Sequence, residues 1–199
     1  MKQFRPLLLF GLIAMTAFRP ADPLPIGAAL PKAEVQLQDV SGKMISLNQS
    51  LQANGLLVMF SCNTCPVVVE NQQRTVAVGN YALGKEVGVV LLNSNEGARG
   101  GSESLEAMKK YAKNQDYQFS YAVDKNNELA DAFGANRTPE CFLFDKQGKL
   151  VYHGAIDDNP QDAGSVQREH LKLAIDELIS GKNISTKKTR SVGCSIKRG

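Results

Sequence analysis

The sequence has little cysteine, no tryptophan and no apolar run long enough to cross a bilayer. Four cysteines in 199 residues are too few for a scaffold stapled by disulfides. The apolar run at residues 7–18 is shorter than the roughly 20 residues of a membrane-spanning helix. The chain also lacks internal repeats and low-complexity segments. What remains is a chain of ordinary composition, long enough to bury one core.

The first residues match the pattern of a secretory signal. Lys2 and Arg5 precede the apolar run, and small residues follow it. This order predicts a signal peptide at residues 1–21, cleaved near Ala17 or Ala21. We therefore expect a periplasmic or otherwise exported protein with no stable membrane insertion after cleavage. An uncleaved anchor is the alternative.

Charge divides the remainder of the chain into two parts. Residues 181–199 contain six basic residues and no acid, whereas the preceding part is net acidic. We assign residues 22–181 to one domain and residues 182–199 to a basic C-terminal tail, expected to lie solvated over an acidic face. Basic residues confined to a short end segment make nucleic acid an unexpected partner.

Strand and helix patterns alternate along the domain. Residues 34–47 read as a β-hairpin, and residues 55–60 and 87–95 read as buried strands. Further strands are expected at residues 119–124 and in a hairpin at 141–154. Helices are expected from Cys65 to residue 83, and at residues 104–114, 126–134 and 166–181. This order predicts an α/β fold with a central mixed sheet, helices on both faces and an N-terminal β-hairpin.

The sequence SCNTCP at residues 61–66 lies between a buried strand and a helix that Pro66 begins. Free N–H groups and the helix dipole at such a junction stabilise a thiolate, so a lowered thiol pKa is expected. Cys62 would be the exposed nucleophile and Cys65, one turn later, the resolving thiol. Structural zinc needs four ligands. The remaining cysteines and histidines are single and widely spaced, so we predict no metal and no cofactor.

The segment RTPE at residues 137–140, together with SCNTCP, resembles the thioredoxin-like fold. That resemblance implies a cis peptide bond at Thr138-Pro139, facing Cys62. Residues 24–198, ending in VGCSIK, are more specifically similar to the redoxins called peroxiredoxin-like, or alkyl hydroperoxide reductase/thiol-specific antioxidant related. Typical peroxiredoxins carry threonine where Cys62 stands, and thioredoxins carry tryptophan before the first cysteine. The sequence therefore departs from both patterns.

Three functions remain open from the sequence. The first is thiol–disulfide exchange at Cys62 and Cys65, acting on a disulfide-containing protein or small thiol, with an unidentified electron donor. The second is an antioxidant thiol peroxidase in which Cys65 meets peroxide, with Arg137, or else Arg99 or Arg74, as the cation. The third is a non-catalytic binding module with Cys62 and Cys65 locked in a structural disulfide.

Two cysteines lie outside the motif. Cys141, in a predicted strand, is interpreted as a small buried apolar residue. Cys194, in the basic tail, is a candidate auxiliary thiol that reaches the active site or a partner. A disulfide between Cys194 and Cys141 is the alternative.

Overall fold

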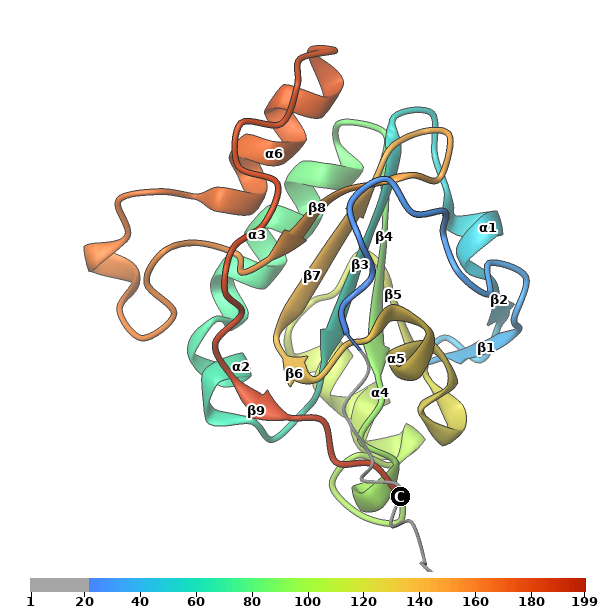
Figure 1. Cartoon of the computed structure of the whole chain (residues 1–199). Coiled ribbons are helices and arrows are strands. Elements are labelled where there is room, and N and C mark those ends of the chain that lie inside the picture. The colour runs from blue at the N-terminus through green and yellow to red at the C-terminus, as the bar shows by residue number, and fades with distance from the viewer. Residues whose placement is uncertain (1–21) are drawn as a thin grey trace, which may run out of the picture.

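A computed structural model describes residues 22–199 of the chain (Figure 1). The predicted signal peptide lies outside these residues. In the described part, no helix combines the length and apolar character needed to cross a membrane.

The fold is built on one mixed seven-stranded sheet in the order β2-β1-β5-β4-β3-β7-β8. Strands β3, β4 and β5 are parallel to each other, and β7 is antiparallel to β3. The central strands have no exposed residue because both faces of the sheet are covered. The strands are β1 Leu37–Asp39, β2 Met44–Ile45, β3 Gly55–Ser61, β4 Val87–Asn93, β5 Ser120–Val123, β7 Glu140–Phe144 and β8 Leu150–Gly154.

Helices cover both faces of the sheet, as predicted (Figure 1). One apolar cluster joins α3, α4 and α6 to side chains such as Met59 and Leu91. The opposite cluster joins α1 and α5 to side chains such as Phe60 and Leu92, because successive strand residues point to opposite faces. The helices are α1 Leu47–Ser50, α2 Pro66–Glu70, α3 Gln72–Leu83, α4 Leu105–Asn114, α5 Glu128–Phe133 and α6 His170–Ile179.

Two helices differ from their predicted extents. The helix that follows the thiol motif is divided at Asn71, whose backbone angles of −86° and 2° depart from helical values. The last helix begins at His170, because residues 157–169 form a loop with one 3₁₀ turn, Ala163–Ser165. The α/β class, the mixed sheet and the N-terminal hairpin are confirmed.

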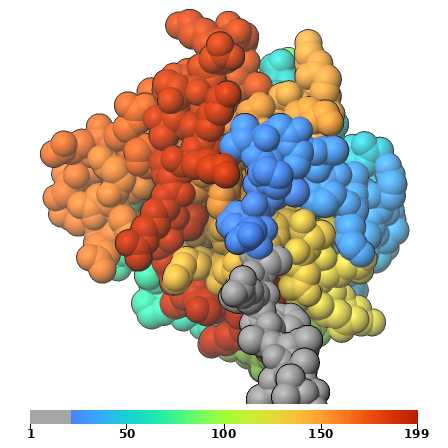
Figure 2. Space-filling view, in the orientation of Figure 1, coloured from blue at the N-terminus to red at the C-terminus, as the bar shows by residue number. Residues whose placement is uncertain are grey.

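The C-terminal tail runs across the surface of the domain (Figure 2). Its short strand β9, Cys194–Ser195, pairs with β6, Arg137–Thr138, in a separate two-stranded sheet. The expectation of a solvated tail is wrong in part. Lys187 and Lys188 are exposed, but Ile184 and Ile196 are buried against the domain. Their burial stabilises the docked tail by removing apolar surface from water.

Candidate active site

Cys62 follows the last residue of β3 and is only 1% exposed. Its Sγ lies 3.3 Å from Thr138 Oγ1, within hydrogen-bond distance. Burial raises the pKa of the Cys62 thiol, the Thr138 hydrogen bond and backbone N–H groups lower it, and the nearby Glu103 carboxylate raises it. The expected lowering of the Cys62 pKa is therefore wrong for this conformation, because desolvation outweighs these hydrogen bonds. The expectation that Cys62 is exposed is also wrong.

Cys65 occupies the N-cap position of α2, and Pro66 takes the first helical position. A proline fits there because its missing N–H would have no partner within the helix. The Cys65 side chain makes no capping hydrogen bond. It forms a disulfide with Cys194, with 6.0 Å between the Cα atoms. Its Sγ also lies 3.4 Å from the Thr138 carbonyl oxygen.

The disulfide corrects two interpretations of the sequence. Cys62 and Cys141 are the free cysteines, so the Cys194–Cys141 pairing is wrong. The third functional interpretation, a Cys62–Cys65 structural disulfide, does not describe this structure either. The tail does carry Cys194 to the motif, where it is bonded to Cys65.

Three cysteines, Cys62, Cys65 and Cys194, lie around Thr138. The Thr138-Pro139 peptide bond is cis, as the resemblance implied. The Thr138 hydroxyl faces Cys62, its carbonyl faces Cys65, and its backbone pairs with Cys194 in the β6–β9 ladder. All three sulfur atoms are therefore arranged around one buried residue.

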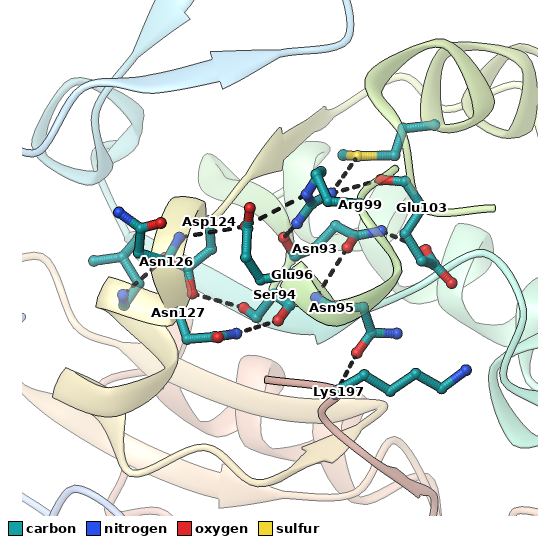
Figure 3. Close-up of polar contacts among 12 residues, drawn as sticks. Asn93, Ser94, Asn95, Glu96, Arg99, Glu103, Asp124, Asn126, Asn127 and Lys197 are labelled. Carbon is teal, nitrogen blue, oxygen red and sulfur yellow. Dashed lines mark hydrogen bonds and ion pairs between the residues drawn. The ribbon is translucent and has the colours of Figure 1, made fainter. Parts of the chain in front are cut away.

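A buried carboxylate that the sequence interpretation missed supports the loop between the two motif cysteines. Glu103 is fully buried. It accepts hydrogen bonds from the Asn63 backbone N–H at 2.9 Å, the Thr64 hydroxyl at 2.7 Å and the Asn93 side chain at 2.7 Å. Figure 3 shows Glu103 and Asn93 lying together beside Arg99. A glutamate within a glycine-rich loop gave no sequence signal for this role, because only folding brings the loop into contact with Asn63 and Thr64.

Glu140 is a second carboxylate that the sequence interpretation missed. It follows Pro139 and is 4% exposed. One oxygen accepts hydrogen bonds from the backbone N–H groups of Asn136 and Arg137, at 2.9 Å and 3.0 Å. The other lies 2.7 Å from His153 Nε2. These contacts hold the turn that presents Thr138 to the thiols.

The three arginines considered as a peroxide-binding cation contact other groups. Arg137 is exposed and donates a hydrogen bond to the Gly193 carbonyl at 3.1 Å. Arg99 donates to the carbonyls of Asn93 and Glu103. Arg74 forms an ion pair with Asp157 at 2.6 Å. Each guanidinium thus has a structural contact, and Arg137 holds the tail beside Cys194.

The parallel strands β3 and β4, with the motif at the end of β3 and a cis proline opposite, define a thioredoxin-like protein. Within that class, the chain belongs to the Redoxin family, whose model matches residues 25–168.

Relatives and solved structures resemble the chain over most of its length. A protein named thiol-disulfide oxidoreductase ResA, from Bacillus thuringiensis subsp. konkukian (strain 97-27), is 29% identical over 150 residues, covering 73% of this chain and 80% of that protein. A hypothetical protein from Sinorhizobium meliloti 1021 is 32% identical with a TM-score of 0.81, covering 89% of this chain and 97% of its own. An uncharacterized conserved protein from Geobacillus kaustophilus is 34% identical with a TM-score of 0.82, covering 88% and 93%.

Proposed function

We propose that the chain is a thiol–disulfide oxidoreductase in which Cys62 attacks a disulfide and Cys65 completes the exchange. The observation that carries the proposal is that Cys65 is already disulfide-bonded, while Cys62 keeps a free thiol against the same residue, Thr138. Thiols that meet around one residue can exchange partners without rearrangement of the fold. The name of the Bacillus relative gives further support.

The exchange has two balanced steps. The Cys62 thiolate attacks one sulfur of the substrate disulfide, forms a mixed disulfide and releases the other sulfur as a thiolate. The Cys65 thiolate then attacks the Cys62 sulfur, forms Cys62–Cys65 and releases the second substrate thiol. The substrate gains two electrons and two protons, and the protein loses them. An external dithiol restores the reduced pair.

The proposed substrate is a disulfide-containing protein or a small disulfide, and nucleic acid is not a proposed partner. Cys62 and Cys65 are 1% and 4% exposed while Cys194 is bonded to Cys65. Cys194 packs against the cluster that contains Cys62 and Cys65. We therefore expect a substrate to reach Cys62 only after the tail moves from the site. Reduction of the Cys65–Cys194 bond removes the covalent tether that holds the tail there.

Insulin reduction with dithiothreitol tests the proposal. We expect the wild type to accelerate insulin reduction and Cys62→Ser to fall to the rate of dithiothreitol alone. Cys141→Ala is the matched thiol control, because Cys141 is fully buried and free. Equal rates for wild type and Cys62→Ser would refute the assignment of Cys62.

We also propose that the protein is exported after removal of residues 1–21. The support is the sequence pattern at residues 2–18, a basic start followed by an apolar run. Bacterial expression of the full chain, followed by fractionation and mass measurement of the intact protein, tests this. Loss of about the first 21 residues in the exported fraction is expected. A full-length, membrane-bound protein would instead support the uncleaved anchor.

The peroxidase alternative, with Cys65 reacting with peroxide, has weaker support. In this conformation Cys65 is disulfide-bonded, and the guanidinium of Arg137 donates to the Gly193 carbonyl. We therefore expect the reduced protein to lose thiol to hydrogen peroxide no faster than free cysteine does. A much faster loss that depends on Cys65 would favour the peroxidase.

A further inference from the structure

Cys194 reaches Cys65 across 129 residues of sequence through a specific backbone pairing. In the β6–β9 ladder, Cys194 stands opposite Thr138 and Ser195 opposite Arg137. Gly193 makes this approach sterically feasible. A Cβ atom built there would lie 2.0 Å from the Thr138 carbonyl oxygen, so a side chain would push the tail away. The backbone pairing and the glycine therefore determine the position of Cys194.

Anchors on both sides of Cys194 fix the tail. Upstream, the Thr189 N–H donates to the His153 carbonyl at 3.0 Å, and the Ala155 N–H donates to the Thr189 hydroxyl at 2.9 Å. Downstream, the Lys197 N–H donates to Asn95 Oδ1 at 2.9 Å, as Figure 3 shows. Cys194 lies in the short segment between these anchors, so we expect a local shift of residues 190–195 to bring its sulfur to Cys65 or take it away.

Two thiols therefore compete for Cys65. Cys62 is three residues from Cys65 in the motif and contacts the Thr138 hydroxyl. Cys194 lies in β9, opposite Thr138, and is bonded to Cys65. Cys65 can pair with only one of them at a time. The disulfide of Cys65 can therefore pass between Cys62 and Cys194 with no change in the number of S–S bonds.

We propose that Cys194 is a third redox-active thiol, which takes over the disulfide from the Cys62–Cys65 pair. The inference rests on the proposed function, because that reaction supplies Cys62–Cys65. The Cys194 thiolate attacks the Cys65 sulfur, the Cys65–Cys194 bond forms, and the Cys62–Cys65 bond breaks. Cys62 leaves as a thiolate and takes the proton that Cys194 lost. No net electrons move in this step, so it needs no further oxidant.

The transfer has a consequence for the reaction cycle. Its product is the state described above, with Cys62 free and covered and the oxidised pair held by Cys65 and Cys194. The protein thereby stores a disulfide while its attacking thiol is withdrawn from solvent. An external dithiol that reduces Cys65–Cys194 starts the next cycle.

Time-resolved peptide mapping tests the transfer. Reduced full-length protein is mixed with oxidised glutathione, quenched with acid and N-ethylmaleimide, and digested with trypsin without reduction. Cys62 and Cys65 share the tryptic peptide 44–74, whereas Cys194 lies in peptide 191–197. The mass of the peptide pair therefore separates the two disulfides. In the wild type, we expect Cys62–Cys65 to appear first and to decay as Cys65–Cys194 rises.

Variants make the result decisive. Cys194→Ser should stop at Cys62–Cys65, and Cys62→Ser should form Cys65–Cys194 at least about tenfold more slowly. Ser195→Ala, which alters an exposed neighbour in β9, should match the wild type. Formation of Cys65–Cys194 at an equal rate in Cys62→Ser, or its failure to appear in the wild type, would overturn the transfer.

The same variants separate this proposal from the function on which it rests. If insulin reduction requires Cys62 but peptide 191–197 is never cross-linked, the transfer fails and the oxidoreductase assignment stands. If insulin reduction does not require Cys62, the oxidoreductase assignment itself fails.

Discussion

The buried Glu103 carboxylate gives the sharpest test of how the thiol loop is held. It accepts three hydrogen bonds, from the Asn63 N–H, the Thr64 hydroxyl and the Asn93 side chain. Two substitutions separate its shape from its charge. Glu103→Gln keeps the shape and one acceptor oxygen but removes the charge. Glu103→Leu removes the charge and every acceptor.

The two losses of stability should differ. A hydrogen bond to a charged group contributes about 1.5–3 kcal/mol, and a neutral one about 0.5–1.5 kcal/mol. In Glu103→Gln the Thr64 hydroxyl can turn to accept a bond, so all three bonds persist in neutral form. The weakening of about 1 kcal/mol per bond is partly offset, because the variant no longer buries a charge, so we expect a net loss of roughly 1–3 kcal/mol. Glu103→Leu leaves the Asn63 N–H and one side-chain N–H of Asn93 unpaired, while the Asn93 amide keeps its bond to the Tyr121 hydroxyl. At about 1–3 kcal/mol for each unpaired donor, we expect a loss of roughly 2–6 kcal/mol.

Both variants should lower the pKa of Cys62, because the Glu103 charge raises it. Urea unfolding gives the stabilities. The rate of Cys62 alkylation by iodoacetamide, followed against pH by peptide mass, gives the pKa. Cys65→Ser/Cys194→Ser is the background for that titration, since it leaves only Cys62 and the buried Cys141 as thiols.

The hydrogen bonds and the charge of Glu103 can be tested separately. Equal stabilities for the Gln and Leu variants would contradict the hydrogen-bond account. A Cys62 pKa that stays constant or rises in both variants would contradict the electrostatic account. Glu106→Gln, an exposed change on the same segment, is the control for charge removal without contact to the loop.

Three further predictions follow from other parts of the structure. Gly193→Ala should weaken the docked tail by about 1–3 kcal/mol, and so lower the ratio of the Cys65–Cys194 disulfide to its free thiols in a glutathione redox buffer roughly 5- to 150-fold; an unchanged ratio by peptide mapping would refute this. Burial raises the pKa of Tyr111 from 10.0 to about 12. The tyrosine should therefore contribute stability that is complete below pH 10.0 and is lost as the pH rises towards 12. In urea unfolding, Tyr111→Phe should lose less stability over this range than the wild type. Equal losses would contradict that pKa. Phe133→Ala, which removes a ring 5.4 Å from Phe60 and 5.1 Å from Phe142, should lower the free energy of unfolding by about 3–5 kcal/mol; a thermal scan showing little change would oppose the packing account.

Local patterns predicted the elements of the fold better than their ends. The apolar runs at β3 and β4 have no exposed residue, and the hairpin β1–β2 forms where alternation around a turn indicated it. The last helix was predicted too long, because periodicity continues into residues that the loop at 157–169 uses for other contacts. One such contact is the hydrogen bond that the Gln167 N–H donates to Asp158 Oδ1 at 3.1 Å.

The sequence alone determined where the two motif cysteines lie relative to the strand before them and the helix after them. An apolar strand, two cysteines and a proline are adjacent in the chain, so their order fixes a thiol at the start of α2. The resemblance extended this to Thr138-Pro139, and the cis bond is present.

Only the tertiary structure decided which thiols meet and how they ionise. Pairing of Cys65 with Cys194, the contact of Glu103 with the motif loop and the burial of Cys62 all depend on segments far apart in sequence. Desolvation is set by everything that packs around a group, and the tail is part of that packing. A local pattern therefore predicted a low pKa for Cys62, whereas the folded surroundings raise it.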